Sequence, residues 1–265
     1  MASKKTLQRI KDIQARLGLV ADGIIGPATL TALENVIEKA LGPPEEPVVH
    51  TMRVSRMGIN QLVKFEIVSK SYYNRFLKSP IWPGGESGVT IGIGYDVGYQ
   101  PKRQIEKDWK GQIDDVDLNA LLKVAGLKKG DAKKKIKKLK NISIPFDAAQ
   151  EVFLTATLPN WAKITHRTYP GVEKLPADAQ AMLLSLVYNR GPSLSQRSSR
   201  REMRAIKPLV AAQDLPRIAA QVRSMKRIWE GKGLGGLLKR RDKEAQIIEN
   251  ARPDSSLPEG EIILV

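Results

Sequence analysis

Hydrophobic residues recur with helical spacing through most of the chain, and the pattern changes at a few points. Near the N-terminus, apolar positions fall in two helical runs separated by the segment ADGIIGPAT. In this connector Asp22-Gly23 is a turn signal, and Gly26-Pro27 interrupts the chain before the second run. The segment GPPEEPVV that follows has the composition of an extended linker. We therefore predict a small helical module over 1–42 and a linker over 43–51.

The rest of the chain is mostly helical in period, with one glycine-rich extended island at 84–98. This mixture predicts an α+β fold in which helices dominate, in a domain covering 52–251. The segment PDSSLPEGEIILV at 252–265 reads as a peripheral tail whose last four apolar residues need something to cover. The glycine spacing is one residue too long for a dinucleotide-binding fingerprint and no phosphate-loop motif occurs, so we set nucleotide binding aside.

The segment INQLVKFEIVSK reads as a helix whose apolar stripe contains Glu66. Ile59, Leu62, Val63 and Ile67 form this stripe, and Glu66 follows Leu62 at helical spacing. Burial would raise the pKa of this carboxyl and keep it protonated near neutral pH, as a general acid requires. A structural ion pair with a lysine or arginine from elsewhere in the chain would explain it equally well.

The segment GVTIGIGYDVG reads as β-structure that glycine leaves bare on one face. Thr90 and Asp96 have the same parity, but on a straight strand they would stand about 20 Å apart. A hairpin or bulge between Gly92 and Gly94 would bring Asp96 back beside Thr90 and would admit a flat sugar ring close to the backbone. Glu86 also has the parity of Thr90, so the sequence leaves it open as an alternative carboxylate.

Two carboxylates across a cleft, Glu66 and Asp96, are the arrangement of most glycoside hydrolases. The pattern E…T-I-G-x-G-Y-D, followed by S-L-x-Y-N-R-G at 185–191, resembles the phage-type lysozyme superfamily. The spacings from Glu66 to Thr90 and from Thr90 to Asp96 are most similar to its pesticin-like muramidase branch. The common phage pattern has its aspartate six residues before the threonine, where this chain has Gly84. The resemblance covers most of residues 52–250 and implies a lysozyme-like domain with a short glycine-rich β-hairpin.

The resemblance also implies an activity, hydrolysis of the β-1,4 bond between N-acetylmuramic acid and N-acetylglucosamine in bacterial peptidoglycan. In these roles Glu66 protonates the leaving oxygen, while Asp96, helped by the Thr90 hydroxyl, positions or activates water on the opposite face of the sugar. This predicts inversion of the anomeric configuration, without a metal or an organic cofactor. The closest alternative is a lytic transglycosylase that needs Glu66 alone, and a non-catalytic wall-binding protein is a further one.

The N-terminal pattern LQRIKDIQARLGLVADGIIGPATLTAL resembles the small three-helix peptidoglycan-binding module found beside many cell-wall hydrolases. The resemblance implies that five residues shape or border a glycan-peptide groove: Asp22, Gly23, Ile25, Gly26 and Thr29. The residues themselves allow a purely structural interpretation, which we favour, in which Asp-Gly is the turn that the fold needs.

Two later segments complete the candidate site. DAQAMLLSLVYNRG predicts a helix that ends at Asn189-Arg190-Gly191. We expect Tyr95, Asn189 and Arg190 to bind substrate or support the site, although a helix cap and an ion pair account equally well for the last two. GLLKRRDKEAQII resembles the closing helix of the family, where Arg240, Arg241 and Glu244 are expected to be structural.

Composition narrows the chemistry and suggests partners. The formal net charge is +16, which predicts attraction to a polyanion: nucleic acid, anionic lipid or an acidic cell-wall polymer. With the resemblance to cell-wall hydrolases, the expected partners are peptidoglycan and lipopolysaccharide or other anionic envelope polymers. The run KKGDAKKKIKKLKN at 128–141 has eight lysines but no arginine or aromatic residue, so we expect no dedicated nucleic-acid partner. We favour a solvated helical face for this run, and a specific binding patch is the alternative. With no cysteine and only two histidines, a zinc hydrolase is disfavoured, and no serine-hydrolase elbow is present.

The N-terminal residues lack a signal-peptide core, and no stretch is apolar enough to span a membrane. We therefore expect a monomeric phage lysis enzyme, an endolysin, that accumulates in the host bacterial cytoplasm before its release to the cell wall and periplasm. A bacteriocin or a secreted effector is the alternative setting.

Overall fold

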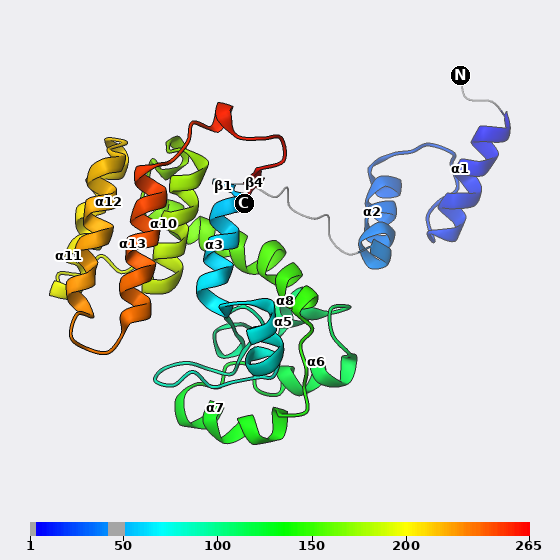
Figure 1. Cartoon of the computed structure of the whole chain (residues 1–265). Helices are drawn as coiled ribbons and strands as arrows, with labels where there is room; N and C mark the ends of the chain where they lie inside the picture. Colours follow the sequence, from blue (N-terminus) through cyan, green and yellow to red (C-terminus); the bar gives the residue numbers. More distant parts are fainter. Residues whose placement is uncertain (1–3, 42–50) are drawn as a thin grey trace. The chain divides into compact units, whose positions relative to one another are not determined.

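The computed structural model describes residues 4–41 and 51–265, which are mostly helical and divide into two units at Val49–His50 (Figure 1). In the first unit, α1 (Lys4–Arg16) and α2 (Pro27–Leu41) flank the predicted connector. The resemblance implied three helices, whereas the part of this unit that the structure describes contains these two. Most of the predicted linker lies outside the described residues.

Gln14 organises the connector of the first unit. Its side-chain amide donates to the Asp22 carboxylate at 2.7 Å and to the Thr29 hydroxyl at 3.1 Å, and its carbonyl oxygen accepts from the Gly23 backbone N–H at 2.8 Å. Gly23 has a φ of 82°, and a Cβ there would meet Leu7 at 2.7 Å, so only glycine fits this turn. A single buried amide therefore satisfies the polar groups of a module too small to have a large core.

The second unit contains the remaining elements. Its helices are α3 (Arg56–Ile67), α4 (Lys70–Tyr72), α5 (Lys102–Trp109), α6 (Asp115–Leu122), α7 (Lys129–Lys135), α8 (Phe146–Val152), α9 (Leu158–Thr168), α10 (Ala177–Arg190), α11 (Arg201–Ala211), α12 (Leu215–Ser224) and α13 (Gly235–Glu249). Its strands are β1 (Arg53–Ser55), β2 (Thr90–Ile91), β3 (Tyr95–Asp96) and β4 (Ile262–Leu264). The prediction of a mostly helical α+β fold is confirmed, with two short two-stranded sheets.

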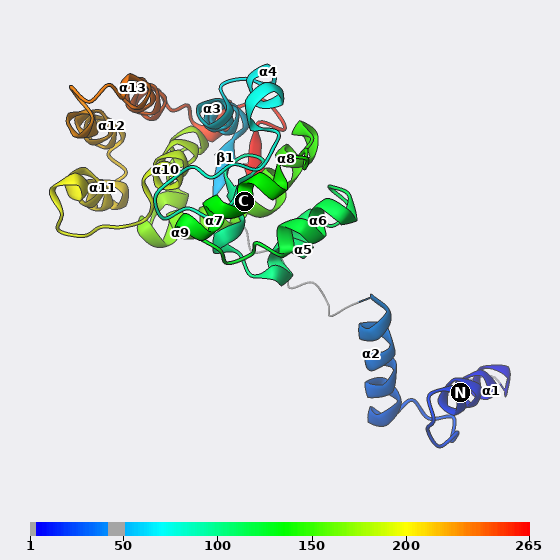
Figure 2. The same cartoon turned by 90° about the horizontal axis from the view of Figure 1, so that it is seen from below.

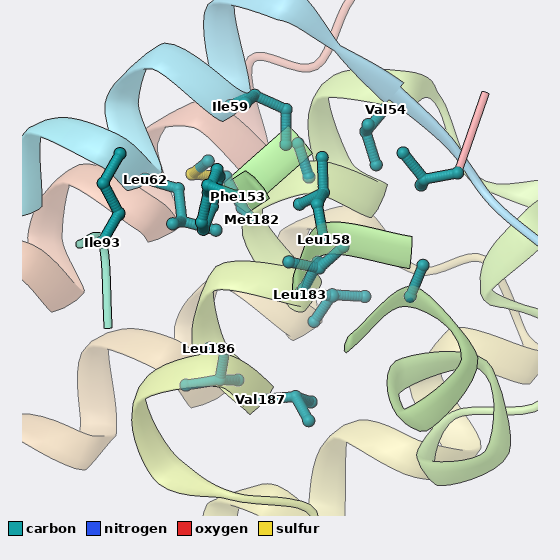
Figure 3. Close-up of a cluster of buried hydrophobic side chains, with 14 of the residues drawn as sticks. Val54, Ile59, Leu62, Ile93, Phe153, Leu158, Met182, Leu183, Leu186 and Val187 are labelled. Atoms are coloured by element: carbon teal, nitrogen blue, oxygen red, sulfur yellow. The ribbon is translucent and has the colours of Figure 1, made fainter. Parts of the chain in front are cut away.

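Helix α10 is the centre of this unit. Ala177 to Val187 are all buried, because α3, α9, α13 and β1 pack around the helix. Figures 1 and 2 both show α11–α13 on one side of the unit and α5 and α6 on the other. Leu62 of α3, Met182 of α10 and Ile93 of the β2–β3 turn belong to the same buried cluster (Figure 3). The predicted Glu66 helix, the glycine-rich segment and the central helix thus share one core.

The C-terminal segment is part of this unit and is not a separate tail. Strand β4 pairs antiparallel with β1, with Val54 opposite Ile263. The side chain of Val265 is 2% exposed, and its backbone carbonyl accepts from Thr51 at 2.7 Å. The predicted boundaries at 51 and 251 are therefore both corrected, because backbone pairing joins residues from the two ends of the domain. This pairing is what covers the apolar end of the chain.

Candidate functional site

Glu66 lies in the last turn of α3 and forms an ion pair. Its side chain is 23% exposed, and its Oε1 accepts from Nη1 of Arg240 at 2.8 Å. Ile59, Leu62 and Ile67 are buried, so the predicted stripe is present and Glu66 lies at its edge. Of the two explanations that the sequence left open, the ion pair with an arginine is observed. It does not exclude a catalytic role, since the carboxylate still reaches solvent.

Behind Glu66 lies a buried network of charged side chains. Arg240 donates to Glu244 at 3.0 Å and to the Ser185 hydroxyl at 3.0 Å, and Ser185 in turn donates to Glu244 at 2.6 Å. Arg241 also donates to Glu244, at 3.0 Å. The sequence R-R-x-x-E makes this possible, because residues three and four apart on α13 share a face. The expectation that these three residues are structural fits these contacts.

The pKa values of the two arginines are shifted in opposite directions. Burial by itself lowers the pKa of Arg240, but the charges of Glu244 and Glu66 outweigh it and the pKa is raised. Burial lowers the pKa of Arg241, and the neighbouring Arg240 adds to the effect. Arg240 is therefore a firmly charged group that has a second carboxylate partner besides Glu66.

Strands β2 and β3 form the hairpin that the glycines suggested. Thr90 lies directly opposite Asp96, and Ile91 opposite Tyr95. The backbone N–H and C=O of Thr90 are hydrogen-bonded to the backbone of Ile81, and the Val97 N–H donates to the Val89 carbonyl at 2.8 Å. Thr90 and Asp96 therefore form a non-hydrogen-bonded pair in the hairpin. In such a pair the Cα atoms lie about 4.5 Å apart, and the two side chains extend from the same face. The hairpin thus places a hydroxyl beside a carboxylate.

The Asp96 carboxylate is held by the backbone around it. The Gly88 N–H donates to both of its oxygens, at 3.1 and 3.0 Å, and the Gly98 N–H donates to Oδ1 at 2.9 Å. Burial raises the pKa of Asp96, although these N–H groups and the charge of Lys128 act against the rise. A Cβ on Gly88 would lie 2.4 Å from Oδ1, so glycine is required for the carboxylate to fit.

Tyr188 connects the hairpin to the surroundings of Glu66. Its hydroxyl donates to the backbone carbonyl of Ile93 at 3.0 Å. It lies so close to Gly94 that a Cβ there would be 2.1 Å from the hydroxyl oxygen. Burial raises the pKa of Tyr188, and the charge of Glu66 raises it further, which places the phenol within electrostatic reach of that carboxylate. A partly buried phenol therefore contacts the hairpin and is affected by the charge of Glu66.

The other candidate residues have partners outside the Glu66, Thr90 and Asp96 group. Glu86 is exposed and pairs with Lys129 at 3.0 Å. Tyr95 is buried in the core, and its hydroxyl donates to Asp108 at 2.7 Å, contacts that give it a role in supporting the hairpin. Asn189 accepts from Arg241 at 3.3 Å, which ties it to the network behind Glu66.

Arg190 lies at the end of α10, where Gly191 caps the helix. Its guanidinium lies over the Trp229 ring, 4.9 Å from the centroid, and donates to the backbone carbonyl of Ser199. Burial, together with the positive charges of Arg200 and Arg241, lowers the pKa of Arg190 to about 10. These contacts favour the supporting role of the two that the sequence allowed.

In the N-terminal unit, Asp22, Gly23 and Thr29 surround Gln14 and hold the turn. The pKa of Asp22 is lowered by hydrogen bonds from the Ile24 backbone and the Gln14 side chain. Ile25 is exposed, and a Cβ at Gly26 would meet nothing within 4 Å. The turn residues therefore have a structural reason to be present, and Ile25 is available on the surface.

The sequence analysis included Tyr188 in the S-L-x-Y-N-R-G motif but gave it no role at the site. It allowed an ion pair at Glu66 but did not identify Arg240 as the partner. The R-R-x-x-E pattern on α13 was the available signal, because it places two arginines and a glutamate on one face of the helix. No group of metal-ligating side chains occurs among the described residues. None of the helices that the structure describes is both long and apolar enough to cross a membrane.

A family model described as a domain of unknown function, DUF8812, matches residues 61–168. The matched region contains Glu66, Thr90 and Asp96, and it ends before α10 and α13, which supply Tyr188 and Arg240. No curated protein matches the chain.

Proposed function

We propose that the chain is an endolysin that hydrolyses the β-1,4 bond between N-acetylmuramic acid and N-acetylglucosamine in bacterial peptidoglycan, with inversion. One observation carries the proposal: Thr90 and Asp96 form a cross-strand pair on a hairpin that Tyr188 ties to the surroundings of Glu66. The two carboxylates and the hydroxyl that the chemistry needs come from a helix and a hairpin that share one core.

Glu66 is the general acid in this proposal. It must hold a proton before the glycosidic oxygen leaves, which removes the negative charge that faces Arg240. Arg240 retains Glu244 and the Ser185 hydroxyl as partners, at 3.0 Å each, so protonation of Glu66 does not strand a buried cation. The network therefore holds Arg240 in place through partners other than Glu66.

Asp96 and Thr90 position or activate the attacking water in this proposal. Oδ2 of Asp96 accepts one backbone N–H, from Gly88, and a carboxylate oxygen has room for a second donor such as water. The Thr90 hydroxyl extends from the same face and can accept or donate to that water. Inversion requires room for a water molecule, so the two carboxyl groups must lie about 6.5–9.5 Å apart.

The N-terminal unit would keep the enzyme on the wall through its resemblance to peptidoglycan-binding modules. The positive charge of the chain would add attraction to anionic envelope polymers. In this setting the protein accumulates in the cytoplasm of a phage-infected bacterium and reaches the wall through a membrane lesion made by another protein.

The test is digestion of purified sacculi, with the released fragments identified by mass spectrometry and their initial anomeric form by NMR. We expect reducing N-acetylmuramic ends with inverted configuration. Glu66→Gln should lower the rate by about 10²–10⁴-fold while wall binding persists, because a general acid contributes roughly that much. Glu106→Gln, at an exposed glutamate of α5, is the matched control and should leave the rate unchanged. Retained configuration, or full activity of Glu66→Gln, would refute the assignment.

A lytic transglycosylase is the second candidate, and the backbone contacts of Asp96 favour it. Three hydrogen bonds from Gly88 and Gly98 give this carboxylate a structural role that needs no catalysis. In that case the fragments carry 1,6-anhydro ends, and Asp96→Asn keeps its activity as long as the hairpin folds. Sacculi that are bound but release no fragments would point to a wall-binding protein.

A further inference from the structure

The lysine-rich segment lies against the loop that carries the candidate site. Gly88 pairs with Lys128 in an isolated antiparallel bridge, and the Lys129 N–H donates to the Ser87 carbonyl at 2.9 Å. Ala132 and Leu139 are buried, which anchors α7 and the following 3₁₀ turn (Ile136–Leu139) on the domain. The segment is therefore a fixed surface next to the hairpin.

Two aromatic rings join this surface. The Lys128 ammonium lies over the Tyr99 ring, 3.6 Å from its centroid, and the Lys133 ammonium lies 5.3 Å from the centroid of Trp82. Each ring is fixed to the same loop, because the Tyr99 hydroxyl donates to the Glu86 carbonyl and the Trp82 indole to the Ser87 carbonyl, both at 3.1 Å. Tyr99 remains 55% exposed. The expectation of a plain solvated helix thus misses its aromatic neighbours.

The charge of this surface is mostly uncompensated. In the described part of the chain, two of its lysines pair with carboxylates: Lys129 with Glu86 and Lys134 with Asp131. Four other lysines on α7 and the 3₁₀ turn are exposed: Lys133, Lys135, Lys137 and Lys138. We call these four side chains the lysine face.

We infer that the lysine face, with Tyr99 at its border, binds carboxylate groups on the same glycan strand whose bond is cleaved at the hairpin. This inference rests on the proposed function, since it extends that site along its substrate. The lysines supply point charges for carboxylates on the peptide stems, and an exposed ring beside them suits the flat face of a sugar. Lys128 connects the two regions, because its charge acts on Asp96 and its ammonium lies over Tyr99.

The location next to the hairpin favours a glycan strand over a membrane. A polymer bound on this surface would continue onto the loop that contains Gly88, whose N–H donates to the Asp96 carboxylate. A bilayer would need no such continuity. The run also lacks the arginines that capture phosphate in bidentate fashion, which fits carboxylates spread along a chain.

The experiment measures binding of soluble glycan strands with free peptide carboxylates to full-length protein carrying Glu66→Gln, which prevents turnover. One variant changes Lys133, Lys135, Lys137 and Lys138 to Gln. The matched control changes four exposed lysines on other helices, with the same loss of charge: Lys163, Lys207, Lys239 and Lys243. Circular dichroism verifies that both fold. The same strands with amidated carboxyls, and phosphatidylglycerol vesicles, are the comparison probes.

We expect the lysine-face variant to bind the strands roughly tenfold more weakly, and the control less than twofold, since exposed charges each contribute modestly. Amidation should reduce binding by the Glu66→Gln protein with all its lysines by a similar factor and abolish the difference between the variants. Tyr99→Leu should weaken binding, whereas Tyr99→Phe keeps the ring and should bind nearly as wild type.

Equal affinity of the two lysine variants for the strands would overturn the inference. Loss confined to the vesicles would also overturn it and assign the face to lipid. The proposed function is judged separately, by whether the wild-type protein releases fragments from sacculi. A protein that cleaves normally but shows no lysine-face effect refutes the inference alone, and one that binds through the lysine face but cleaves nothing refutes the proposed function alone.

Discussion

Gly94→Ala tests whether Tyr188 holds the hairpin in place. Gly94 has a φ of 72°, and an added Cβ would lie 2.1 Å from the Tyr188 hydroxyl oxygen. Two costs follow. A non-glycine residue in the left-handed region costs about 1–2 kcal/mol. The phenol must also move by about 1 Å to reach an ordinary contact, which breaks its 3.0 Å hydrogen bond to the Ile93 carbonyl.

An unpaired buried polar group costs about 1–3 kcal/mol, so the total for Gly94→Ala is roughly 3 kcal/mol. Gly231 is the matched control, because its φ is 73° and nothing lies within 4 Å of a Cβ there. Gly231→Ala should therefore cost only the backbone term, about 1–2 kcal/mol. For a domain of this size each kcal/mol lowers Tm by about 2–4 °C, so Gly94→Ala should lose several degrees more than the control.

The assay is urea unfolding of both variants and of a double variant, Gly94→Ala with Tyr188→Phe. Removing the hydroxyl relieves the closest contact, so the double variant should be more stable than the sum of the two single changes predicts, by about 1 kcal/mol or more. Equal destabilisation at Gly94 and Gly231, or strict additivity in the cycle, would refute the claim that the phenol fixes the hairpin.

Three other changes probe the same domain. Asp96→Asn should abolish the proposed hydrolysis. Because burial raises the pKa of Asp96, the stability that its protonated form provides is full at acid pH and is lost as pH rises through that pKa, so the variant should gain stability relative to wild type with rising pH in urea titrations. Glu244→Gln removes the carboxylate that pairs with two buried arginines and should lower the free energy of unfolding by about 3–5 kcal/mol. Glu249→Gln, at an exposed ion pair, should lower it by less than about 1 kcal/mol, and similar unfolding midpoints for the two variants would contradict this. Removing 262–265 deletes β4 and should lower Tm clearly, and an unchanged Tm would show that the β1–β4 pairing is dispensable.

Local pattern was enough to predict the helices and the hairpin. The apolar stripe around Glu66 follows from the helical period, and it is buried as expected. The return of Asp96 to Thr90 follows from the glycines between them, because Gly92 and Gly94 take φ values of 57° and 72° that other residues rarely adopt. Both features depend on residues close in sequence, so the sequence by itself contains the information.

The partners of the candidate site were decided by the tertiary structure. Arg240 reaches Glu66 from 174 residues away, and Tyr188 reaches Ile93 from 95 residues away. Periodicity reports which face of an element is apolar but not which element packs there, and a buried arginine has the same pattern as an exposed one. The C-terminal strand was misjudged for the same reason, since its partner β1 stands at the other end of the domain. Long-range packing therefore brought a helix, a hairpin and a basic run, each of which the sequence indicates by itself, together in one domain.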